Sequence, residues 1–174
     1  MEKMTNHNCM ASGVEKFATI EEPYHFLDSG LPNVYLVGIK YFVCECGNII
    51  AEIPTVKQLM QLIARDIVES PFDLKGAELR FLRKRLGKKA SEYAQLLGFT
   101  PETLSRIENG KQPISGSGQK LAKLAYCVFS EDAHLAECGR SILQSILEDI
   151  KKNQEKKIIL EIDSNQEWRE LKAA

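Results

Sequence analysis

A segment near the middle of the chain, TPETLSRIEN at residues 100–109, carries side chains suited to reading nucleic acid. Leu104 and Ile107 lie three residues apart, so they share the inner face of a predicted helix. Five polar residues then lie on or near its outer surface: Glu102, Thr103, Ser105, Arg106 and Asn109. An arginine among short polar groups can donate two hydrogen bonds to the edge of a guanine. The segment therefore predicts a helix that reads the major groove of DNA.

Both ends of this helix carry strong local signals. The hydroxyl of Thr100 can accept a hydrogen bond from an unpaired backbone N–H, and Pro101 suits the first helical position. Asn109 and Gly110 end the helix, and Pro113 prevents its continuation.

Two preceding helices are predicted to hold the reading helix in place. The first ends at Gly87, and the second, shorter one ends where the chain turns at Gly98. Their inner faces are formed by apolar residues at helical spacing: Leu79, Leu82, Leu86, Tyr93, Ala94 and Leu97. Three helices with two glycine turns indicate a helix-turn-helix; the alternative is a helical bundle with a solvated basic face.

The charge distribution favours contact with DNA. Residues 74–126 carry 11 Lys and Arg against 4 Asp and Glu, although the whole chain of 174 residues has a formal net charge of −1. Residues 1–73 carry 5 basic and 10 acidic side chains, and residues 127–174 carry 7 and 10. A basic region of this kind is expected of a protein that neutralises phosphates.

The same residues resemble the Xre-type helix-turn-helix of phage Cro and repressor proteins. The resemblance lies in Leu79-Arg80, Arg83, Gly87, the Leu97-Gly98 turn and the run SRIENG at residues 105–110. It implies a lambda-repressor-like domain in which Arg83 pairs with Glu108. It also implies phosphate contacts from Lys89, Thr100, Asn109 and Lys111, and base contacts from Glu102, Thr103 and Arg106. The family often has glutamine at the start of the second helix, where this chain has Ala90.

The N-terminal third predicts a β-hairpin with two cysteines at its tip. Residues 34–43 are rich in β-branched and aromatic side chains, residues 44–48 have turn chemistry, and residues 49–53 are apolar again. A tetrahedral zinc site needs four ligands, and the candidates are His7, Cys9, Cys44 and Cys46. Two interpretations remain: a structural zinc ion, or a hairpin that has lost the metal and folds through its apolar face.

Over residues 20–126 the chain resembles bacterial regulators with an N-terminal zinc-ribbon-like domain and a C-terminal Xre domain, grouped with MqsA-type antitoxins. In that family two CxxC pairs bind structural zinc, and neither pair is intact in this sequence. The resemblance implies a regulator that binds an operator and docks a toxin.

Two amphipathic helices flank the DNA-binding region. Residues 56–70 place Leu59, Leu62, Ile63 and Ile67 on one stripe, and a longer stripe extends over residues 131–152. The second stripe either covers the core or forms a dimer interface. Residues 158–162 could form a short strand, and the role of Trp168 stays open.

The predicted fold class is α+β, a small, degenerate zinc-ribbon-like β-hairpin domain followed by an all-α helix-turn-helix domain. We expect a hairpin domain at residues 1–55, a connecting helix at 56–73, the DNA-binding domain at 74–129 and a tail at 130–174. Neither a signal peptide nor an apolar stretch of membrane-spanning length occurs, so we expect a cytoplasmic protein. No catalytic motif stands out, so no enzyme is expected. The expected function is that of a dimeric, sequence-specific repressor and, as the resemblance implies, an autoregulating antitoxin; the alternative is a module that docks a partner such as a toxin.

Overall fold

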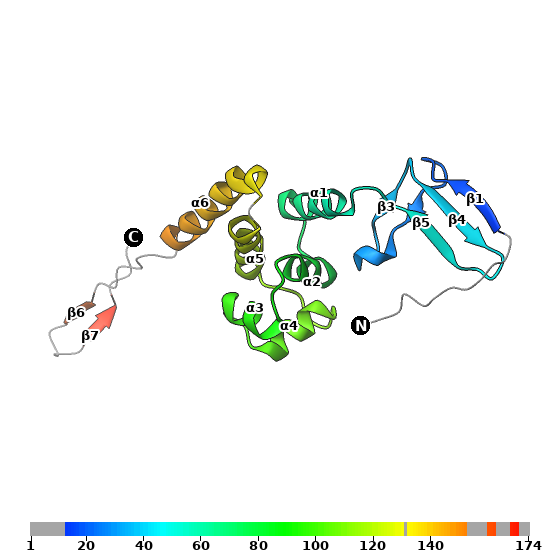
Figure 1. Ribbon diagram of the computed structural model, residues 1–174. Helices are drawn as coiled ribbons and strands as arrows, with labels where there is room; N and C mark the ends of the chain where they lie inside the picture. The colour runs from blue at the N-terminus through cyan, green and yellow to red at the C-terminus, as the bar shows by residue number, and fades with distance from the viewer. Residues whose placement is uncertain (1–12, 131, 153–159, 163–167, 171–174) are drawn as a thin grey trace.

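The computed structural model describes residues 13–130, 132–152, 160–162 and 168–170. The described residues form a β region at one end, followed along the chain by a group of helices (Figure 1). This arrangement agrees with the predicted α+β class.

The main sheet of the β region has three antiparallel strands in the order β1-β4-β5. Strands β4 (Lys40–Cys44) and β5 (Ile49–Glu52) form the predicted hairpin, with Gly47 in its turn at a φ of 85°. The hairpin prediction is confirmed. Strand β1 (Gly13–Phe17) pairs with the other side of β4, and no strand was predicted at these residues.

A second, two-stranded sheet joins β2 (Tyr24–His25) to β3 (Tyr35–Leu36). The apolar run at residues 34–43, predicted as one strand of the hairpin, is divided between β3 and β4. That part of the prediction was wrong. Gly38 adopts a φ of 77° between the two strands, a conformation that glycine reaches at little cost.

The helices follow the predicted order. Helix α1 agrees with the amphipathic segment predicted before the DNA-binding region, and α5 follows α4 along the chain. The bounds of the helices are Val56–Glu69 (α1), Gly76–Arg85 (α2), Ala90–Leu96 (α3), Pro101–Glu108 (α4), Gly116–Phe129 (α5) and Ala136–Lys152 (α6). Two short 3-10 turns, η1 (Leu27–Ser29) and η2 (Ala133–Leu135), and the strand pair β6 (Leu160–Ile162) and β7 (Trp168–Glu170) complete the described structure.

One hydrophobic core joins helices α1 to α5. Its largest fully buried side chains come from α2, α3, α4 and η2: Leu79, Leu82, Tyr93, Leu104 and Leu135. Helix α1 contributes Ala64, Ile67 and Val68 to the same core, and Leu31 reaches it from the β region. Burying side chains of this size stabilises the fold by about 1.5 to 3 kcal/mol each. This shared core fixes the position of α4, the helix expected to read DNA.

An ion pair fastens α1 to the segment before α6. Arg65 donates from Nε and Nη2 to the two carboxylate oxygens of Asp132, both at 2.8 Å. The side chain of Asp132 is only 5% exposed. Hydrogen bonds from Arg65 hold the pKa of Asp132 at about 2, below the ordinary value for an aspartate.

We expect the replacement Asp132→Asn to lower the free energy of unfolding by about 2 kcal/mol at pH 7. A carboxyl with a lowered pKa stabilises the fold above its unfolded value near pH 4, and this stabilisation is lost as the pH falls toward 2. Urea unfolding at pH 7, 4 and 2.5 measures the effect. The difference between the two proteins should shrink over the acidic range; a difference that stays constant with pH would contradict the assigned role of the carboxylate.

Helix α6 carries two apolar stripes. Cys138 and Ile142 pack against the core on the side of α5. Leu143, Leu147 and Ile150 are 46%, 49% and 48% exposed. The helix therefore covers α5 with one stripe and leaves a second uncovered within a single chain. None of the described helices combines the length and apolar character needed to cross a membrane.

Candidate nucleic-acid interface

Helix α4 begins as the sequence predicts. The hydroxyl of Thr100 accepts a hydrogen bond from the backbone N–H of Thr103 at 3.2 Å, and Pro101 occupies the first turn. Leu104 and Ile107 are almost fully buried against the core. The start and the inner face of α4 are confirmed.

The opposite face of α4 is open to solvent. Glu102, Ser105 and Arg106 are exposed, and Thr103 is half-buried at the edge of the face. In the part of the chain that the structure describes, Arg106 enters no ion pair, so its guanidinium can reach a ligand without first losing a protein partner. An unpaired arginine on a convex helix face suits a groove of DNA.

A lysine lies at each end of the segment formed by α3 and α4. Lys89 precedes α3 and Lys111 follows the turn after α4, and both side chains are exposed. The family resemblance implies phosphate contacts from both of these residues.

The side-chain amide of Asn109 already makes hydrogen bonds within the protein. Its Nδ2 donates to the carbonyl oxygen of Ser105 at 2.7 Å, and its Oδ1 accepts from Nη2 of Arg80 at 2.6 Å. The amide therefore closes the end of α4. The resemblance had implied a phosphate contact here, and in this conformation a phosphate would have to replace one of these two bonds.

Arg83 and Glu108 connect α2 to α4. The Nε of Arg83 lies 2.6 Å from Oε1 of Glu108, and its Nη2 lies 2.9 Å from Oε2. Their side chains are 13% and 6% exposed, so the pair is largely buried. The hydrogen bonds to Glu108 raise the pKa of Arg83, which keeps the guanidinium charged. A bidentate pair of this geometry fixes the angle at which α4 projects from α2.

Arg80 is a positioning residue that sequence reasoning missed. Its Nη2 donates to the carbonyl oxygen of Glu108 at 2.9 Å as well as to Asn109, so it secures the last turn of α4. Its Nε also lies 3.4 Å from Oε2 of Glu108. The signal was present in the sequence, since Arg80 and Arg83 lie three residues apart and share one face of a helix.

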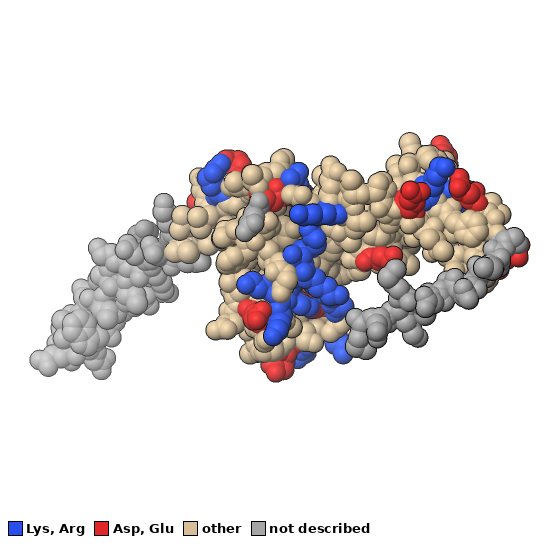
Figure 2. Space-filling model, viewed as in Figure 1, with Lys and Arg blue, Asp and Glu red and all other residues tan. Residues whose placement is uncertain are grey.

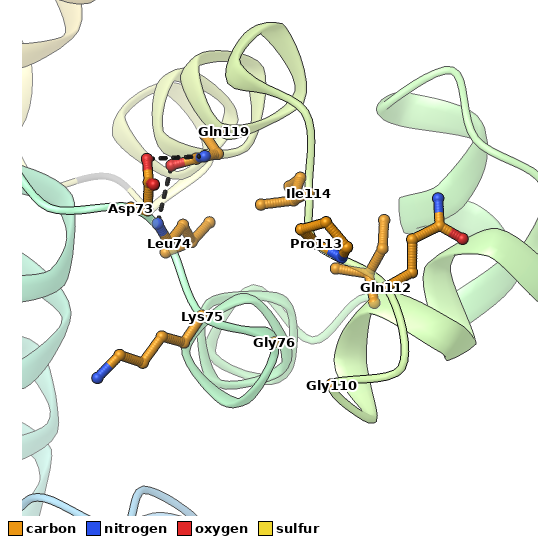
Figure 3. Close-up of a pocket in the computed structure, with 10 residues that line it drawn as sticks. Asp73, Leu74, Lys75, Gly76, Gly110, Gln112, Pro113, Ile114 and Gln119 are labelled. Carbon is orange, nitrogen blue, oxygen red and sulfur yellow. Dashed lines mark hydrogen bonds between the residues drawn. The ribbon is translucent and has the colours of Figure 1, made fainter.

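A close backbone approach sets the distance between α2 and α4. A Cβ added to Gly76 would lie 2.0 Å from the carbonyl oxygen of Ile107 and 3.2 Å from the carbonyl carbon of Glu108. Figure 3 shows Gly76 beneath the loop that follows α4, in an open hollow also lined by Gly110, Pro113 and Ile114. Only glycine allows the start of α2 to lie this close to the end of the reading helix.

The hollow is closed on one side by Gln119 of α5. Its Oε1 accepts from the backbone N–H of Leu74 at 2.8 Å, and its Nε2 donates to Asp73 at 3.1 Å (Figure 3). These bonds hold the connector between α1 and α2 against α5. The hollow is therefore accounted for by contacts that hold the fold together.

The surface charge follows the division seen in the sequence. Lys and Arg side chains form a stripe across the helical part, whereas acidic side chains gather on the β region (Figure 2). Six of the exposed cations lie at or near the ends of α2, α3 and α4: Lys75, Lys84, Arg85, Lys89, Arg106 and Lys111. The potential around α4 therefore attracts a polyanion.

The expected zinc site is only partly within the described residues. Cys44 is buried at the end of β4, and Cys46 is exposed in the turn, where its Sγ accepts from Nδ2 of Asn48 at 3.5 Å. His7 and Cys9 lie outside the described residues. Within the described ranges, no group of three or more His, Cys, Asp or Glu side chains could hold a metal ion. The two thiols alone are fewer ligands than tetrahedral zinc requires.

Comparison with known proteins points to the same helices. Residues 76–134 match the family model of a helix-turn-helix domain. Comparisons with curated proteins and with solved structures returned no match. The matched residues extend from the start of α2 to η2 and include every contact described above between α2 and α4. The chain therefore contains a helix-turn-helix domain, which suggests a DNA-binding regulator.

Proposed function

We propose that the protein is a sequence-specific regulator of transcription that inserts α4 into the major groove of double-stranded DNA. The observation that supports this most directly is the division of α4 into a buried apolar face and an exposed polar face centred on Arg106. The buried face holds the helix rigidly, so the exposed face is organised before DNA arrives. Little ordering entropy then remains to be lost on binding.

Each side chain of the interface has a proposed task. Lys89, Thr100 and Lys111 contact phosphates and set the register of the protein on the duplex. Arg106 donates to a guanine, Glu102 accepts from a cytosine amino group, and Thr103 contacts a neighbouring base edge. Arg83, Glu108 and Arg80 do not touch DNA in this scheme; they hold α4 at its angle.

The proposal predicts different losses for two substitutions. Arg106→Ala should cost about 1 to 3 kcal/mol at the selected site and little on random DNA, so specificity falls. Lys111→Ala should weaken binding to both DNAs equally and reduce the salt slope by about 1. The site is first isolated from a random duplex library with the purified protein, and affinities are measured by fluorescence anisotropy. Lys57→Ala, on α1, is the matched control, and equal losses for Arg106→Ala and Lys111→Ala would refute the division of tasks.

We further propose that the protein acts as a homodimer and represses transcription. A monomer of this size reads one short half-site, and helix-turn-helix proteins gain affinity by reading two half-sites about one helical turn apart. Protection of two such half-sites in a footprint of the selected DNA would support the proposal, and protection of a single half-site would contradict it.

The family resemblance extends the proposal to an autoregulating antitoxin that also docks a toxin. The uneven charge supports a second binding surface, because residues 13–55 carry 6 acidic and 2 basic side chains whereas the helix-turn-helix region is basic. A basic partner encoded beside this chain should co-purify with it and be released by salt. Co-expression with the product of the adjacent gene tests this.

A further inference from the structure

Strand β5 is an exposed edge of the three-stranded sheet. Within the described residues it pairs only with β4, and its outer side carries no strand. Ile49 and Ile50 are 53% and 61% exposed. Natural edge strands are usually protected by charged residues, bulges or a covering element, because an unprotected edge pairs with other chains. The opposite edge, β1, carries two adjacent charged residues, Glu15 and Lys16, whereas β5 carries one, Glu52.

The backbone hydrogen-bond pattern shows which groups of β5 face outward. The backbone N–H of Cys44 donates to the carbonyl oxygen of Asn48 at 2.9 Å, so these two residues form a hydrogen-bonded pair. Such pairs alternate along an antiparallel ladder, which makes Phe42 and Ile50 the next one. The N–H and C=O groups of Ile50 therefore point toward β4. Those of Ile49 and Ala51 point outward, available to a further strand.

We propose that a second copy of this chain binds at this edge, with the two β5 strands antiparallel about a two-fold axis at Ile50. In this register Ile49 of one copy lies opposite Ala51 of the other, and the outward groups of both residues exchange hydrogen bonds. The two Ile50 side chains face each other as a non-hydrogen-bonded pair, the closer of the two antiparallel arrangements. The backbone groups displayed by β5 are thus complementary to themselves.

The side chains are complementary in the same register. Val43 and Ile49 form one apolar row on β4 and β5, and it would continue into Ala51 and Tyr41 of the second copy. On the other face Phe42 and Ile50 form a second apolar row, which would continue into Ile50 and then Phe42 of the second copy.

Charge does not oppose this register. Glu52, the charged residue of β5, lies opposite Lys40 on β4, and in the dimer it would face Asn48 of the second copy rather than another carboxylate. No like charges meet on the axis. The result is a continuous sheet built from both copies, which leaves the helical parts outside it.

This inference extends the proposed function, since a dimer allows two α4 helices to read two half-sites, but its test requires no DNA. Helix α4 belongs to the helical part and takes no part in the sheet (Figure 1). Pairing through β5 therefore does not use α4 itself.

Sedimentation velocity of the full chain over a range of concentrations tests the proposal. The unaltered protein should show a reversible monomer–dimer equilibrium. Ile50→Lys should raise the dissociation constant at least about tenfold, because two lysines would meet on the axis. Val14→Lys, an equally exposed position on the opposite edge strand, should leave the constant unchanged. Circular dichroism shows whether each variant is folded.

Cross-linking tests the register itself. With oxidised glutathione as the oxidant, Ile50→Cys should form a disulfide between copies; the two thiols lose two protons and two electrons, and glutathione disulfide is reduced to two thiols. The Cα atoms of such a pair lie about 4.5 Å apart, within the range a disulfide spans. Ile49→Cys is the matched control, because its thiol faces Ala51 of the other copy. Peptide mass spectrometry separates these links from links through the native cysteines.

The rival surface is the exposed stripe of α6 formed by Leu143, Leu147 and Ile150. If Leu147→Lys abolishes the dimer and Ile50→Lys does not, the interface lies on α6 and the proposal is overturned. A protein that stays monomeric at every concentration overturns it as well. If Ile50→Lys dissociates the dimer but the unaltered protein binds no DNA, the interface stands and the proposed function fails.

Discussion

Replacement of Glu108 by alanine is expected to lower the free energy of unfolding by about 3 to 5 kcal/mol. The carboxylate is 6% exposed and accepts hydrogen bonds from Arg83 and Arg80. Without it, the guanidinium of Arg83, itself 13% exposed, keeps its charge in a largely buried position and loses its partner. Leaving such a charge unpaired costs more than the intact pair contributes. Urea unfolding followed by circular dichroism measures the loss.

The hydroxyl of Tyr93 cannot balance the charge of Arg83 once Glu108 is removed. Tyr93 lies close to this pair and is fully buried, and its hydroxyl has no hydrogen-bond partner among the described residues. Burial raises the pKa of Tyr93, so this hydroxyl cannot ionise near neutral pH to balance Arg83.

Two variants control the Glu108→Ala experiment. Glu102→Ala removes a carboxylate from the exposed side of the same helix and should change stability by no more than about 0.5 kcal/mol. Glu108→Gln keeps the volume and one acceptor, so its loss should be intermediate. If Glu108→Ala is as stable as Glu102→Ala, the pair does not hold α4 in place.

Replacement of Gly76 by alanine should cost about 3 kcal/mol, at the upper end of the range for overpacking. The added Cβ would lie 2.0 Å from the backbone carbonyl oxygen of Ile107, and a backbone atom in the last turn of α4 cannot rotate away as a side chain can. The strain would separate α2 from α4 where Arg80 and Arg83 bind Glu108. DNA affinity should therefore fall together with the unfolding midpoint.

The chain offers a matched control in Gly116, at the start of α5. It is also the first residue of a helix, but a Cβ there would meet no atom within 4 Å. Gly116→Ala should be neutral or stabilising by up to about 1 kcal/mol, because alanine loses less backbone entropy on folding. Equal losses of unfolding free energy for Gly76→Ala and Gly116→Ala would mean that stability does not depend on the close approach of α2 and α4.

The helices and their caps could be predicted because their signals are local. Thr100 and Pro101 begin α4, Leu104 and Ile107 face inward, and the glycine turns lie where expected. Each signal depends on residues within one or two turns of each other, so it can be recognised without knowing what lies across the core.

The strands were harder to predict because pairing is not local. Strand β1 forms although its residues show little alternation, since β4 supplies a second edge to which it can bind. The break at Gly38 divides a run that looked continuous. A sequence window cannot report which backbone groups will be left unpaired elsewhere.

By itself, the sequence determined a basic helix-turn-helix with an exposed arginine on its third helix, because periodicity, capping residues and charge are properties of short stretches of chain. Only the tertiary structure decided that Asn109 accepts a hydrogen bond from Arg80, that residue 76 must be glycine, and that α6 presents a second, uncovered apolar stripe. Those facts depend on which atoms from distant parts of the chain lie within bonding or contact distance, and that is fixed when the elements pack.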